Sequence, residues 1–78
     1  MNTRRFVIRS GQDLARTVAE SRRERGLTQA QLAARAGVER TYLAKLEAGH
    51  VVQQVDRALA LLRSLGVEVT AELHAEDV

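Results

Sequence analysis

The segment from Leu27 to Gly37 constrains the fold most, because it carries signals for both ends of one short helix. Thr28 is a suitable N-cap, and Gln31, three residues on, can return a hydrogen bond to the backbone of that cap. Leu27 and Leu32 stand where two side chains can pack across the first turn as a hydrophobic staple. Gly37 adopts a positive φ at little cost and can end the helix. The segment therefore predicts a helix of about two turns.

A second short helix is expected directly after it, from about Glu39 to Ala48. Leu43 and Leu46 would point inward from this helix, and Gly49 would end it. Two short helices joined by a glycine turn form a helix-turn-helix pattern. In this pattern Ala33 must be small, because the two helices cross there almost backbone to backbone. The sequence therefore predicts a helix-turn-helix between residues 28 and 49.

Further elements are expected on both sides of this pair. Ser10 caps a first helix that ends at Gly26, and a fourth helix ends at Gly66. Five apolar residues are expected on one face of the fourth helix: Val55, Ala58, Leu59, Leu62 and Leu65. Arg5–Arg9 is a candidate for a short strand, and residues 67–74 alternate between apolar and polar as a half-buried strand does. The expected fold class is a mainly α bundle of four to five helices with a C-terminal strand.

Composition excludes several classes of function. The 78 residues suffice for one domain, and the chain has no cysteine, which excludes disulfides and cysteine-based metal sites or nucleophiles. His50 and His74 lie in an expected loop and near the end, and no serine has a neighbouring histidine and carboxylate. We therefore expect no enzymatic activity, cofactor or metal site. No apolar run reaches the length of a signal peptide or a membrane span.

Charge is unevenly distributed along the chain. The net charge of +2 divides into +5 over residues 1–50 and −3 over residues 51–78. A basic first half favours a polyanionic partner, although scattered surface charge gives the same count. The outward residues of the expected third helix, left exposed once the leucines are buried, are Glu39, Arg40, Thr41, Ala44 and Lys45. Arginine and lysine on such a face can bond guanine edges in the major groove of DNA.

Other residues of the first three helices are candidates for contacts with the DNA backbone. Gln29 stands at the positive end of the second helix, where side-chain and backbone donors can hold a phosphate. The full set of backbone candidates is Thr28, Gln29, Tyr42, Arg22 and Arg23. Two alternatives stay open: Tyr42 can pack its ring on the scaffold, and Arg22, Arg23 and Arg25 can form a solvated face. Glu47 would repel phosphate and is expected to pair with a nearby arginine instead.

The stretch LTQAQLAARAGVERTYLAKLEAG resembles the helix-turn-helix of lambdoid phage repressors and Cro, in the large bacterial group of Xre-like regulators. The resemblance covers about residues 12–66. It implies a lambda-repressor-like bundle in which Gln29 contacts the DNA backbone, and it places four residues at base-reading positions: Arg40, Thr41, Ala44 and Lys45. The chain departs from the group at Glu39, where a Ser or Thr cap is usual, and in the loop 50–54, which lacks the usual proline.

The C-terminal strand is unusual in a small helical protein. Val67, Val69, Ala71 and Leu73 lie on one of its sides. A lone strand leaves its backbone groups unpaired, so it must pair with Phe6–Ile8 of the same chain or with a second copy. Repressors of this type read two half-sites about 34 Å apart and need two-fold symmetry. We therefore expect these four side chains at a homodimer interface.

A repressor-like domain closed by a terminal strand resembles the HipB-like antitoxins of HipBA-type toxin–antitoxin modules. The resemblance implies a cytoplasmic homodimer that represses its own operon at a palindromic operator and binds a HipA-like serine/threonine kinase toxin. The expected organisation is an arm at 1–9, a DNA-binding domain at 10–66, a dimerisation strand at 67–74 and a tail at 75–78. Two alternatives are a free-standing Xre-family regulator without a toxin and a helical interaction module that never binds DNA.

Overall fold

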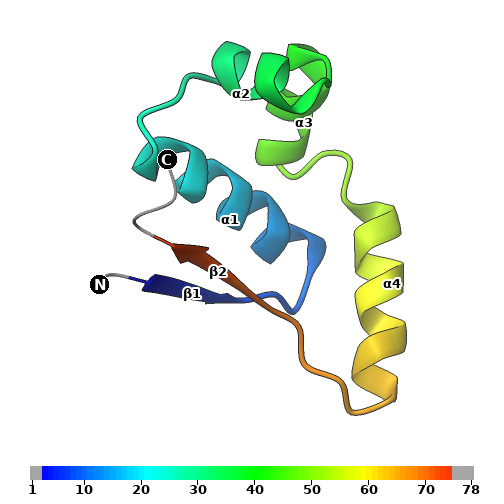
Figure 1. Ribbon diagram of the computed structural model, residues 1–78. Helices are drawn as coiled ribbons and strands as arrows, with labels where there is room; N and C mark the ends of the chain where they lie inside the picture. Colours follow the sequence, from blue (N-terminus) through cyan, green and yellow to red (C-terminus); the bar gives the residue numbers. More distant parts are fainter. Residues whose placement is uncertain (1–2, 75–78) are drawn as a thin grey trace.

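The computed structural model describes residues 3–74 and contains four helices and a two-stranded sheet (Figure 1). In chain order the elements are β1 Thr3–Val7, α1 Gly11–Glu24, α2 Gln29–Ala36, α3 Arg40–Glu47, α4 Gln53–Ser64 and β2 Thr70–His74. The predicted fold class, a small helical bundle with a C-terminal strand and an N-terminal strand, is confirmed. The predicted tail at 75–78 lies outside the described residues.

The predicted caps of α2 are confirmed. The Thr28 hydroxyl accepts a hydrogen bond from the Gln31 backbone at 3.0 Å, and the Gln31 side chain accepts one from the Thr28 backbone at 2.8 Å. Gly37 ends the helix with a φ of +74°. Glu39, which replaces the usual Ser or Thr, makes no side-chain hydrogen bond to the start of α3. That helix therefore begins without a side-chain cap.

The C-terminal strand pairs with the N-terminal strand of the same chain. β1 and β2 are antiparallel, with Phe6 opposite Ala71. The strands begin and end differently from the predicted 5–9 and 67–74. β2 cannot begin at Val67, because the backbone N–H of Val67 still bonds the Leu62 carbonyl at the end of α4. β1 ends before Arg9, whose backbone N–H donates to the Asp13 carboxylate.

The sheet lies along α1 and is fastened to it by charged groups (Figure 1). Arg4 of β1 donates to Glu20 and to Glu24 of α1, each at 2.8 Å. The Arg4 guanidinium also lies 4.9 Å from the centre of the Phe6 ring. These groups are largely exposed, so each contact adds little on its own. Together they hold the sheet over one face of α1.

The buried core is small and made of small side chains. Its apolar members are Ile8, Ala15, Ala19, Ala33, Leu43, Val52 and Leu59. Three of these seven residues are alanines, which let helices approach closely. Ala33, on α2, is only 3% exposed, in agreement with the predicted close crossing of α2 and α3.

The prediction for α4 was wrong for two of its five apolar residues. Val55, Leu59 and Leu62 are buried or half-buried, whereas Ala58 is exposed and Leu65 is 76% exposed. The reason lies in the helical geometry: at about 100° per residue, Ala58 lies about 100° and Leu65 about 120° from Leu59 around the helix axis. The helix therefore carries two apolar stripes, and only one of them packs on its own chain.

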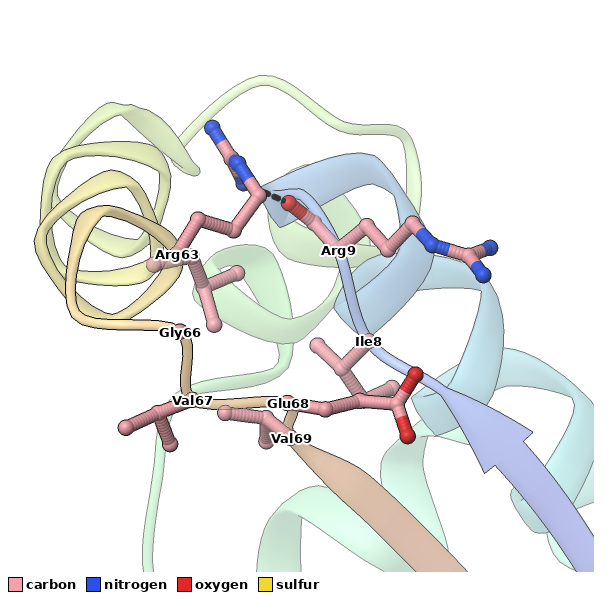
Figure 2. Close-up of a pocket in the computed structure, with 8 residues that line it drawn as sticks. Ile8, Arg9, Arg63, Gly66, Val67, Glu68 and Val69 are labelled. Carbon is pink, nitrogen blue, oxygen red and sulfur yellow. Dashed lines mark hydrogen bonds between the residues drawn. The ribbon is translucent and has the colours of Figure 1, made fainter.

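The C-terminal end of α4 is tied to the start of α1 (Figure 2). The Arg63 guanidinium donates to the Arg9 carbonyl, which lies just before that helix. A small pocket of about 170 Å³ remains between α4 and the connection to β2, with Ile8 and Leu59 in its lining. The tie fixes α4 against the N-terminal segment and leaves the outer side of α4 uncovered.

Gly11 lets the start of α1 come close to the start of α4. Its backbone N–H donates to Asp56 at 2.6 Å, and an added Cβ would lie 2.4 Å from the Val52 Cβ and 2.8 Å from the Val52 carbonyl oxygen. Gly11→Ala should therefore lower the free energy of unfolding by about 1–3 kcal/mol. Urea unfolding followed by circular dichroism measures it. Gln53→Ala, on the exposed first turn of α4, should stay near wild type, and equal stability of the two variants would contradict the packing described.

Candidate nucleic-acid interface

The α2–α3 pair is held at a fixed angle by its turn. The Gly37 backbone N–H donates to the Ala34 carbonyl at 3.4 Å, and the Val38 N–H donates to the Ala33 carbonyl at 3.0 Å. These bonds satisfy two of the last four carbonyls of α2 and require the positive φ that glycine supplies. Figure 1 shows the pair at one end of the molecule, away from the sheet. The two helices therefore form one rigid unit at this end of the molecule.

The outer face of α3 is polar, basic and exposed. Leu43 is buried at 3% exposure, which turns Arg40, Thr41 and Lys45 outward. Ala44 was expected to point outward as well, and it is half-buried. Neither Arg40 nor Lys45 makes a hydrogen bond or ion pair with any other residue between 3 and 74. The two cations are therefore available to an external anion or acceptor.

Gln29 and Thr28 stand at the N-terminus of α2, as predicted. One Nε2 hydrogen of Gln29 is donated to Glu47 at 3.0 Å, which leaves the other hydrogen for an external acceptor. The Thr28 hydroxyl accepts a hydrogen bond within the capping box and keeps its own hydrogen for an external acceptor. The first backbone N–H groups of a helix also favour an anion, because they have no partner within the helix. This end of α2 therefore provides several donors to a phosphate.

Arg22 lies inside the domain rather than on its surface. Its Nε and Nη2 donate to the Glu47 carboxylate at 2.8 and 3.0 Å, and its Nη1 donates to the Leu27 carbonyl at 2.8 Å. The Arg22 and Glu47 side chains are only 11% and 5% exposed. The predicted pairing of Glu47 with a nearby arginine is confirmed. All three guanidinium nitrogens of Arg22 already donate within the domain and its side chain is mostly buried, so little of it is accessible to DNA, whereas Arg23 is exposed.

The environment of Glu47 keeps its carboxylate charged. The hydrogen bond from Arg22 is the main cause of a lowered pKa, the hydrogen bond from Gln29 adds to it, and burial opposes it. The pKa of Arg22 is raised, chiefly by the same carboxylate. One charge-assisted cluster thus joins α1 through Arg22, α2 through Gln29 and α3 through Glu47. It fixes the positions of the helix that would read bases and the helix end that would hold a phosphate.

Tyr42 and the strand residues complete the predicted set. Tyr42 is 48% exposed, and its hydroxyl makes no hydrogen bond within residues 3–74.

Val69, Ala71 and Leu73 are half-buried within their own chain, whereas Val67 is 44% exposed. The structure therefore does not bring these four residues together as one exposed face. The exposure of Leu61 and Leu65 on the outer side of α4 was missed by the sequence analysis.

Two further observations concern the described part of the chain. Between residues 3 and 74, no three His, Asp or Glu side chains gather in a way that could hold a metal ion. None of the helices in this range has the length and apolar character needed to cross a bilayer.

A short helix pair with a glycine turn and a basic outer face on its second helix defines a helix-turn-helix domain. A family model described as helix-turn-helix matches residues 18–71, which is more than half of the chain. The chain therefore belongs to the helix-turn-helix family of the Xre and lambda-repressor type, whose members are DNA-binding transcription regulators. No match was found among curated protein sequences or among solved structures.

Proposed function

We propose that this chain is a sequence-specific repressor that reads a palindromic operator in double-stranded DNA. The observation that carries the proposal is the outer face of α3, where Arg40 and Lys45 are exposed and have no partner among residues 3–74. In the major groove such cations can bond the acceptors of guanine. We assign base contacts to four residues of this helix: Arg40, Thr41, Ala44 and Lys45.

We assign contacts with the DNA backbone to the residues around this face. They are Thr28, Gln29, Tyr42 and Arg23. The N-terminus of α2 and the exposed cation of Arg23 suit phosphate, which carries the sequence-independent part of the affinity. Arg22 acts indirectly, since its ion pair with Glu47 holds α1 against α3.

We further propose that the repressor is a homodimer. Reading two half-sites about 34 Å apart requires two copies related by a two-fold axis. The sequence placed the interface at Val67, Val69, Ala71 and Leu73. Of these, Val67 alone is turned to the outside, so the strand region contributes to an interface through that residue and its neighbours on α4.

The particular role we propose is that of an autoregulating antitoxin of a HipBA-like module. The supporting features are a helix-turn-helix domain closed by a terminal strand and a net charge of −3 over residues 51–78, which differs from the basic DNA-binding half. Its partner would be a HipA-like kinase toxin. A transcription regulator acts where the genome is, so we place it in the cytoplasm.

A salt titration tests DNA binding against the alternative of a protein-interaction module. The probe is the DNA fragment upstream of the chain's own reading frame. The logarithm of the binding constant should fall with the logarithm of salt concentration, with a slope of about −0.9 per phosphate contact. If the chain does not bind the fragment, or if its binding constant does not change with salt concentration, the interaction module would be favoured.

Co-expression with the product of the neighbouring reading frame tests the antitoxin role. The antitoxin proposal expects a kinase that arrests growth alone, a stable complex with this chain, and restored growth when both are made. A neighbouring product that is not a kinase and does not bind the chain would favour a free-standing regulator.

A further inference from the structure

A cavity lies where residues of α1, α2 and β2 meet. Its volume is about 390 Å³, more than twice that of the pocket beside α4. Sites that bind small molecules usually measure about 300–1,000 Å³ and are lined mainly by apolar side chains with a few polar groups. The cavity is partly open to solvent, so a ligand can enter it without unfolding the domain. It is therefore large enough for a small organic molecule.

The walls of this cavity are mainly apolar. Val18 contributes to them from α1, and Leu73 contributes from β2. Leu27 and Leu32, the two leucines of the expected staple at the start of α2, supply another part of the lining. All four side chains are only half-buried, so their own chain covers them in part. An apolar ligand would remove more of this surface from water, together with its own apolar surface.

The charged groups at the cavity are cationic. Arg25 and Arg35 line it, and none of the described lining residues is acidic. Arg35 is exposed and makes no hydrogen bond or ion pair with another residue between 3 and 74. Arg22 also lines the cavity, but its charge is already balanced by Glu47. The cavity therefore favours a ligand with a negative charge, and Arg35 is the cation best placed to meet that charge at the open side.

Ser21 adds a neutral hydrogen-bonding group. It lines the cavity from α1 and is half-buried. Serine and threonine hydroxyls on a helix can bond a carbonyl of the preceding turn, as the Thr17 hydroxyl does to the Asp13 carbonyl. The Ser21 hydroxyl makes no such bond within residues 3–74. It can therefore donate to an oxygen atom of a ligand.

The pocket beside α4 is a poorer candidate for a charged ligand. Its volume is only about 170 Å³, and its lining includes both Arg63 and Glu68. Charges of opposite sign give no preference for an anion or a cation. The Arg63 guanidinium also donates already to the Arg9 carbonyl. The cavity between α1, α2 and β2 is therefore the site on which a ligand class can be argued.

We propose that the cavity between α1, α2 and β2 binds a small carboxylate with an apolar body, of the size and chemistry of a medium-chain fatty acid. The apolar body lies against Val18, Leu32 and Leu73, and the carboxylate faces Arg35. An ion pair with a guanidinium and burial of an apolar chain are both available here, whereas a neutral or cationic ligand would gain only the second. This site goes beyond the proposed repressor function and needs no DNA.

A titration of the full chain with decanoate, followed through the amide NMR signals of isotope-labelled protein, tests the site. The signals of Ser21, Leu32 and Leu73 should move, and those of α4 should stay in place. The dissociation constant should be about 1 mM or lower, as is typical of a ligand with about a dozen non-hydrogen atoms. If the signals of the lining residues do not move, the proposal is wrong.

A cationic ligand with the same chain length separates charge selection from simple apolar binding. Decyltrimethylammonium should bind at least about fivefold more weakly than decanoate, because Arg35 repels it. Equal dissociation constants for the two ligands would overturn the proposed preference for an anion.

Three substitutions locate the ligand. Ser21→Phe places a ring in the cavity and should abolish decanoate binding. Arg35→Gln should weaken binding by about threefold to fivefold, the effect of losing one exposed ion pair. Arg57→Gln removes an exposed cation of α4 and should bind as wild type does. Equal affinities of the Arg35→Gln and Arg57→Gln variants would overturn the proposal, even if Ser21→Phe fails to fold.

Dilution of the ligand-free protein tests whether a second copy of the chain fills the cavity instead. The signals of Ser21, Leu32 and Leu73 should be independent of protein concentration. If they move on dilution, the cavity belongs to an interface between copies, and the proposed ligand site is wrong. None of these measurements involves DNA, so they leave the proposed repressor function untouched whichever result is obtained.

Discussion

Replacing Glu47 by alanine should lower the free energy of unfolding by about 3–5 kcal/mol, because it leaves the buried guanidinium of Arg22 without its counter-charge. Arg22 and Glu47 are 11% and 5% exposed, so little solvent screens the loss. Gln29 also loses its acceptor, which loosens α2 as well as α3. A small domain is stable by only about 5–15 kcal/mol, so the variant should be largely unfolded well below the wild-type midpoint. Urea unfolding followed by circular dichroism measures the effect.

Two further variants sharpen that test. Glu39→Ala removes an exposed carboxylate that makes no cap hydrogen bond, so its stability should stay near wild type. Arg22→Met combined with Glu47→Leu removes both charges and keeps apolar volume, so it should recover most of the stability lost by Glu47→Ala. A Glu47→Ala variant as stable as Glu39→Ala would contradict the role given to the cluster.

The same cluster predicts how stability depends on pH. The pKa of Glu47 is lowered in the folded state, first of all by the hydrogen bond from Arg22. Its contribution is therefore complete above the pKa of about 4.3 expected in the unfolded chain, and it is lost as pH falls through the lower folded value. Glu47→Gln should lose this part of the acid dependence.

The second large effect is expected on DNA binding. Arg40→Ala combined with Lys45→Ala removes both exposed cations of the α3 face. An arginine bidentate to guanine contributes about 1–3 kcal/mol, and a dimer carries two copies of the face, so operator affinity should fall by at least about 100-fold. Arg5→Ala, which removes a cation from the sheet, should bind nearly as wild type does. Fluorescence anisotropy with a labelled operator at fixed salt measures all three, and equal affinities would contradict the assignment of the reading face.

The local features of the helix-turn-helix could be predicted because their signals lie within a few residues of one another. Thr28, Gln31 and Gly37 specify the caps of α2 without reference to any distant residue. The inward position of Leu43 follows from helical periodicity alone, and the outward direction of Arg40 and Lys45 follows from it. The fold class and the exposed basic face of α3 could therefore be predicted from the sequence.

The remaining features depend on which elements meet in space. Nothing local distinguishes the inner stripe of α4 from the outer one, so Ala58 and Leu65 were placed on the wrong side. The ion pair between Arg22 and Glu47 joins residues 25 positions apart. The sequence alone did not show which of Arg22, Arg23 and Arg25 pairs with Glu47. Pairing of the C-terminal strand within its own chain was one of two alternatives that the pattern left open.

Selection of binding sites from random double-stranded DNA, carried out with wild type and with Arg40→Ala, tests most directly whether the exposed face of α3 reads bases. Wild type should enrich a palindrome whose half-sites are about 34 Å apart, or one turn of the double helix. The variant should enrich the same palindrome with the preference lost at one base pair in each half-site. An identical consensus from both proteins, or no enrichment by wild type, would contradict the assignment of base reading to α3.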